Sequence, residues 1–185
     1  MVKKILKRIF VIILIILLPV CTYFTVICAI KHRHTSIQYV SYTIVDVMYA
    51  KSELQKEYSF DPLSNRVYRN ALEEELKLKW YYYDVVDLGE GLNGLSNCYY
   101  RTIKIHEDLD GYWYCKTMCH EMIHLKYLTG DETYTSYMTF VRLYESDNEI
   151  LRRVGAWYGL NQIENRVYGE YNCRDYVISY FKEKV

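Results

Sequence analysis

The chain has 185 residues, which is long enough for one domain with a proper core and too short for two of ordinary size. Its formal net charge is zero, so no basic surplus indicates nucleic-acid binding and no acidic surplus indicates a polycationic partner. Tyrosine is abundant, with 22 residues, which suits an extended binding surface.

The first predicted element is a membrane-spanning helix at residues 9–30. Four basic residues lie within residues 1–8, and the next 22 residues carry no charge, which is enough to cross a bilayer as a helix. This apolar stretch is longer than that of a secretory signal and lacks a good cleavage site, so we favour an uncleaved anchor over a cleaved signal. The positive charge before the span predicts a cytoplasmic N-terminus and an extracytoplasmic domain at residues 31–185. We interpret His32 and His34 as residues at the level of the lipid headgroups.

Two helices and one strand are predicted next. Residues 35–59 carry apolar side chains at helical spacing, and residues 66–80 follow the turn "DPLSN" as a second helix. Residues 87–97 contain three glycines and two asparagines and are predicted to be a loop. Residues 98–106 alternate between apolar and polar side chains and are predicted to be a strand.

A long helix is predicted over residues 112–129, ended by Gly130, and it carries the most informative motif of the chain. Within it, His120, Glu121 and His124 fit the pattern H-E-x-x-H. Residues four apart share one face of a helix, so both imidazoles can reach one metal ion. The glutamate then lies beside a metal-activated water and can act as its base. The alternative is a helix with polar residues on a solvent-exposed face.

A helical wheel separates the side chains of this helix into two faces. Cys115, Met118, Met122 and Leu125 fall on one stripe, which is predicted to face the core, and the histidines fall on nearly the opposite side. Cys115 and Cys119 point away from the histidine face, so we interpret them as buried apolar residues. The disulfide state of the cysteines beyond the span stays open; they are Cys98, Cys115, Cys119 and Cys173.

A catalytic zinc site needs a third protein ligand, and three acids compete for that role. Asp131 is predicted to cap the helix that follows Gly130, which gives it a structural role. Glu132 shares its stripe with small residues that permit close packing against the first helix. Glu145 points to the other side of its helix and, at about 1.5 Å per residue, lies beyond the histidines. We therefore predict Glu132 as the third ligand, with Glu145 and Asp131 as alternatives.

The strand at 98–106 has two interpretations. It can be the sheet edge beside the active-site helix, where an extended peptide adds as a further strand, or an ordinary core strand. The rest of the chain is predicted to be helical in short pieces, broken near residues 155–159 and 168–170. His106 lies near acidic residues in the sequence, and we interpret it as a surface hydrogen-bonding group rather than as a metal ligand. The predicted fold class is therefore α+β, mostly helical, with a small sheet.

The segment "HEMIHLKYLTGDETYTSYMTF" resembles the HExxH zincin, or gluzincin-like, metallopeptidase superfamily, closest to small bacterial membrane-anchored members. "ILRRVGAWYGL" resembles a glycine-centred segment that follows in that family, and the likeness covers about a quarter of the chain. The resemblance implies a minimal zincin-like domain with His120, His124 and Glu132 as Zn²⁺ ligands and Glu121 as the catalytic base. The family has alanine and asparagine after the third-ligand glutamate, where this chain has Thr133 and Tyr134.

Together these features predict a membrane-anchored zinc metallopeptidase that acts on a peptide or protein substrate. Zinc and Glu121 would activate water for attack on the peptide bond. The alternative is a non-catalytic anchored domain that binds a partner through its tyrosine-rich surface, with a structural metal or none.

Overall fold

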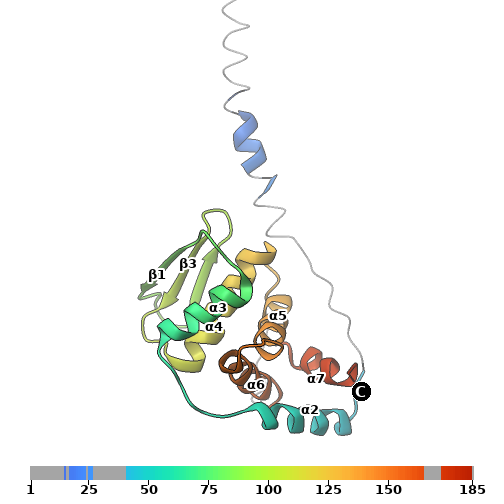
Figure 1. Ribbon diagram of the computed structural model, residues 1–185. Coiled ribbons are helices and arrows are strands. Elements are labelled where there is room, and N and C mark those ends of the chain that lie inside the picture. The colour runs from blue at the N-terminus through green and yellow to red at the C-terminus, as the bar shows by residue number, and fades with distance from the viewer. Residues whose placement is uncertain (1–14, 16, 24, 27–40, 165–171, 185) are drawn as a thin grey trace, which may run out of the picture.

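The computed structural model describes residues 15, 17–23, 25–26, 41–164 and 172–184 (Figure 1). This part of the chain is mostly helical with one small sheet, so the predicted α+β class is confirmed. The described elements of the domain are, in chain order, α2 (Ile44–Glu57), α3 (Asn65–Leu76), β1 (Tyr82–Val86), β2 (Gly94–Asn97), β3 (Thr102–His106), α4 (Gly111–Tyr127), α5 (Glu132–Tyr144), α6 (Glu149–Glu164) and α7 (Arg174–Lys182).

The predicted N-terminal features fall largely outside the described residues. This holds for the basic segment 1–8, for much of the predicted span 9–30, and for His32 and His34. Among the residues that are described, no helix combines the length and the apolar character that crossing a membrane requires.

The sheet has the strand order β1-β3-β2, so β3 lies in the middle and β2 forms one edge. β1 pairs with β3 in parallel, and β2 pairs with it in antiparallel orientation. Of the two interpretations of residues 98–106, the core strand is confirmed, because Ile103 and Ile105 of β3 are fully buried. The strand is also shorter than predicted, since residues 98–101 form a turn. β2 lies within the segment 87–97, so the prediction of loop for that whole segment is wrong.

The first two predicted helices form, with different ends. α2 begins at Ile44 because Thr43 and Asp46 make a reciprocal capping box there; residues 35–40 of the prediction lie outside the described residues. α3 ends at Leu76 rather than near residue 80, because Lys77 adopts a left-handed conformation that stops the helix.

The predicted break at residues 155–159 is wrong, because α6 runs through it without interruption. Its two glycines there permit close packing rather than a turn. A Cβ atom added at Gly155 would lie 2.4 Å from the backbone nitrogen of Tyr144, and one at Gly159 would lie 2.8 Å from a Leu54 methyl carbon. The glycines thus let α6 lie directly against α5 and α2. The predicted break at 168–170 lies outside the described residues.

Helix α4 occupies the centre of the domain (Figure 1). It contacts β2 and β3 of the sheet and also packs against α3, α5 and α6. The predicted core stripe of α4 is confirmed, since Cys115, Met118, Met122 and Leu125 are all buried. Because sheet and helices surround α4, most of its side chains are buried, including those of the motif it carries.

Candidate metal centre

The H-E-x-x-H motif lies on a buried stretch of α4 and not on a solvent-exposed face. His120 is 4% exposed, Glu121 7% and His124 7%. A buried imidazole or carboxylate is costly unless it is hydrogen-bonded, paired or bound to a metal. The interpretation of the motif as a solvated helix face is therefore excluded.

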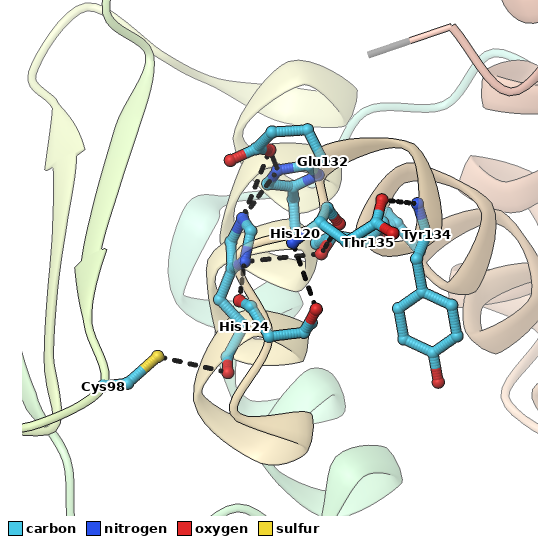
Figure 2. A network of polar contacts seen from close by, with 9 residues as sticks. Cys98, His120, His124, Glu132, Tyr134 and Thr135 are labelled. Carbon is cyan, nitrogen blue, oxygen red and sulfur yellow. Dashed lines mark hydrogen bonds and ion pairs between the residues drawn. The ribbon is translucent and has the colours of Figure 1, made fainter. Parts of the chain in front are cut away.

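Three side chains converge on one point beside α4 (Figure 2). His120 Nε2 lies 2.9 Å from Glu132 Oε2, His124 Nε2 lies 3.3 Å from the same oxygen, and the two Nε2 atoms are 3.2 Å apart. In a tetrahedral zinc site with bonds of about 2.0–2.1 Å, ligand atoms lie roughly 3.3 Å from one another. The donor atoms are thus spaced as the ligands of a single ion are, and this group can hold a metal ion.

The end of α4 orients His124 through its other ring nitrogen. Leu128, rather than the predicted Gly130, adopts the left-handed conformation that ends the helix. The turn brings the Thr129 carbonyl oxygen to 2.7 Å from His124 Nδ1. A carbonyl only accepts hydrogen bonds, so Nδ1 carries a proton and Nε2 points to the group. This is the usual way in which a protein fixes a metal-binding histidine.

Glu132 opens α5 directly after its N-cap. Asp131 caps α5 as predicted, because its side chain accepts a hydrogen bond from the backbone N–H of Tyr134 at 2.9 Å. Thr135, Ser136 and Thr139 are fully buried. These small side chains let α5 approach α4 closely enough for the Glu132 carboxylate to reach both histidines.

Glu145, the alternative ligand, lies elsewhere. It is the C-cap residue of α5, and its carboxylate accepts hydrogen bonds from Tyr180 at 3.0 Å and Lys184 at 2.8 Å. His106 also stays outside the group, since it lies 3.5 Å from Asp87 at the end of β3. The structure therefore brings together His120, His124 and Glu132 and keeps the alternatives apart from them.

The charges of the group depend on one another. Burial lowers the pKa of His120 to about 4, although its hydrogen bond with Glu132 opposes this change. Burial would raise the pKa of Glu132, but hydrogen bonds from His120 and His124 outweigh it and lower the pKa to about 2. Burial likewise opposes protonation of His124, yet Glu132 and Glu121 raise its pKa. The carboxylate is thus ionised and His120 neutral near pH 7, which are the states that bind a metal.

Glu121 lies next to the group, against the edge strand. A Cβ atom added at Gly94 of β2 would lie 2.8 Å from Glu121 Oε1 and 2.8 Å from the methyl group of Thr117. Only a glycine at this position lets β2 approach the carboxylate so closely. Burial raises the pKa of Glu121, and the charge of His124 and a hydrogen bond with Ser96 oppose this shift.

A cavity of about 830 Å³ lies over these side chains. Every residue of β2 lines it, together with the histidine face of α4 and part of α6. This size is within the range of small-molecule and peptide sites. Sequence reasoning did not identify β2, Lys116 or Thr117 as parts of it. Lys116 could have been found, because it precedes His120 by four residues and so shares its helical face.

The cysteines contribute no ligand to the group. Cys98, Cys115, Cys119 and Cys173 all carry free thiols in the part of the chain that is described. Cys115 and Cys119 are fully buried, as predicted for apolar core residues. Cys98 donates its thiol hydrogen to the His124 carbonyl oxygen at 3.4 Å and thus supports α4 from the side of the sheet (Figure 2).

Comparisons with protein-family models, with characterised proteins and with solved structures found no match to this chain.

The two glutamates of α5 provide a direct test of the ligand set. We expect Glu132→Ala to weaken metal affinity by at least about tenfold, because loss of even an outer-shell partner costs about 10–100-fold. Glu145→Ala is the matched control and should leave metal affinity unchanged, since Glu145 lies at the other end of α5 and bonds Tyr180 and Lys184 rather than the histidines. Competition with a chelator measures both. Loss of metal in Glu145→Ala but not in Glu132→Ala would show that the ligand assignment is wrong.

Proposed function

We propose that this protein is a membrane-anchored zinc metallopeptidase of the HExxH zincin type. The observation that carries the proposal is the convergence of His120, His124 and Glu132 in a cavity that also contains Glu121. The spacing of the donor atoms and the burial of the histidines agree with a metal centre. The cavity gives a substrate access to it.

Zinc is the metal that this donor set fits best. Two imidazoles and one carboxylate are a common ligand set of catalytic zinc, which keeps a further coordination position open. Zinc bound in this way supplies a Lewis acid that acidifies water and polarises a carbonyl group. His120, His124 and Glu132 would hold the ion, and the bond from His124 Nδ1 to the Thr129 carbonyl would keep that ring oriented.

Glu121 would transfer protons without binding the metal. It follows His120 directly, so its side chain leaves α4 about 100° away from that histidine, on the side of β2. There its carboxylate accepts a proton from the attacking water and then donates it to the nitrogen of the leaving amine. The small exposure of Glu121 limits competing water, which strengthens its interaction with developing charge.

The edge of β2 offers a binding position for an extended peptide. Within the described residues β2 pairs with β3 alone, and all of its residues line the cavity. A substrate segment can add to this edge as a fourth strand, with its backbone hydrogen-bonded to that of β2. Because Glu121 lies against Gly94, the scissile bond of a peptide held there would lie near the base.

The membrane anchor is proposed from the sequence. The 22 uncharged residues at 9–30 follow a basic segment, which favours a single span with the catalytic domain on the extracytoplasmic side. The neutral net charge gives no support for nucleic acid as a partner.

Removal of the metal tests the proposed activity. The full chain, purified in detergent, is expected to contain one zinc per molecule by elemental analysis and to hydrolyse an unstructured protein such as casein. A chelator should abolish hydrolysis, and one equivalent of zinc should restore it. A folded chain that binds no metal would contradict the proposal and favour the non-catalytic interaction domain.

A further inference from the structure

A second group of polar side chains lies in the same cavity, one helical turn from the metal-binding group. Lys116 precedes His120 by four residues on α4, and it lines the cavity together with Thr117. Tyr158 and Asn161 of α6 also line the cavity. None of these side chains has a role in the proposed chemistry.

Lys116 is a partly buried cation whose charge is not matched by a close carboxylate. Its ammonium nitrogen lies 5.5 Å from the centre of the Tyr158 ring, within the range of a cation–π contact. Throughout the described ranges, no acidic side chain comes within ion-pair distance of it. Burial lowers the pKa of Lys116, and the more distant carboxylates of Glu121 and Glu132 oppose this shift. An unpaired cation is costly to keep in such a position.

Metal binding would leave Lys116 as the unbalanced charge. The carboxylates of Glu121 and Glu132 would balance a divalent ion held by the group, so they would not also neutralise the ammonium. Thr117 follows Lys116 but lies on the β2 side of α4, where its methyl group packs against Gly94, so it leaves the charge of Lys116 unmatched. An ammonium that lines the cavity and has no ion-pair partner among the residues described is a suitable donor for an anionic oxygen.

We propose that Lys116 forms a subsite that binds a carboxylate group of the peptide substrate, one helical turn from the metal centre. This inference rests on the proposed function and adds a substrate class to it. The carboxylate can come from an aspartate or glutamate side chain or from the C-terminus of a short peptide. Both sources present the same chemistry, and Tyr158 lies beside the Lys116 ammonium in the same cavity.

Probes that anchor on the metal test this subsite without the need for a known substrate. A series of alkyl hydroxamates with two to six methylene groups would carry either a terminal carboxylate or the matching carboxamide. We expect one spacer length at which the carboxylate binds the zinc-loaded full chain about 10–100-fold more tightly than the carboxamide, as for a hydrogen bond to a charged group. Lys116→Gln should reduce this ratio to about one, and Lys116→Arg should largely retain it. Lys126→Gln, on the same helix but outside the cavity lining, is the matched control.

The outcomes separate this inference from the proposed function. If no carboxamide probe binds the zinc-loaded chain, the metal centre itself fails, and the subsite with it. If the carboxamides bind and no carboxylate binds more tightly at any spacer length, only the subsite is refuted. This comparison uses the unmodified chain, so it holds even if a Lys116 variant does not fold.

Competing peptides then distinguish the two sources of the carboxylate. Displacement of the best probe by peptides with a free C-terminus, but not by their amides, would indicate the terminal carboxylate. Displacement that requires aspartate or glutamate, and is lost with asparagine or glutamine, would indicate a side chain. Displacement that depends on neither feature would overturn the assignment of the subsite to substrate.

Discussion

His120→Ala and His124→Ala are each expected to lower zinc affinity by more than a hundredfold. Each histidine contributes one of three ligand atoms that lie 2.9–3.3 Å apart, and alanine leaves only two of them. Loss of an outer-shell partner already costs about 10–100-fold, so loss of a ligand should cost more. Elemental analysis of the purified full-length chain and competition with a chelator would measure the effect.

His106→Ala is the matched control for this experiment. His106 lies at the end of β3 and contacts Asp87 rather than the group, so its loss should leave zinc affinity unchanged. Circular dichroism should confirm that each variant is folded. This check is needed because His124 also hydrogen-bonds the turn after α4, and His124→Ala removes that contact as well. Stoichiometric zinc in both His120→Ala and His124→Ala would refute the metal centre.

The part of the site that the sequence predicts well is the part made by local geometry. His120 and His124 share a face because they are four residues apart on one helix, whatever surrounds that helix. Glu132 follows from the cap at Asp131 and from small residues that allow two consecutive helices to approach. Both depend on short stretches of chain, where periodicity and capping are informative.

The sheet is the part of the fold that local sequence patterns predict least well. Three of the four residues of β2 (Gly94, Ser96 and Asn97) are of types common in turns, so its composition is that of a loop, and it becomes a strand only by pairing with β3. Its position as the edge strand depends on β1 pairing with the other side of β3. The pairing of β1 with β3 joins two strands that lie on either side of β2 in the sequence, and no local pattern encodes it.

Packing also overrides local preference elsewhere. Gly155 and Gly159 are typical of a helix break, yet α6 continues through both. Glycine is needed at these positions because α5 and α2 leave no room for a side chain. In α4 the helical wheel separates the histidines from the core stripe, but it does not show whether the histidine face is open to solvent. The elements packed against α4 bury the histidine face, and this burial makes the H-E-x-x-H motif a candidate metal site.

Glu121→Gln is expected to abolish most hydrolysis while the metal and the fold remain. Glutamine has the shape of glutamate, so it can occupy the same space between Gly94 and α4. The amide cannot accept a proton from water, and loss of a general base costs about 10²–10⁴-fold in rate. Zinc content should not change, because Glu121 is outside the group of three ligand atoms.

The stability of this variant gives an independent readout. Burial raises the pKa of Glu121, so the folded metal-free chain holds the charged form at a cost. A neutral glutamine removes that cost, and Glu121→Gln should unfold at a denaturant concentration no lower than that of the unmodified chain. Glu107→Gln, an exposed residue after β3, is the matched control for both activity and stability. Equal rates of hydrolysis in the Glu121→Gln variant and the unmodified chain, at equal zinc content, would remove Glu121 from the mechanism, because no glutamine can act as the base.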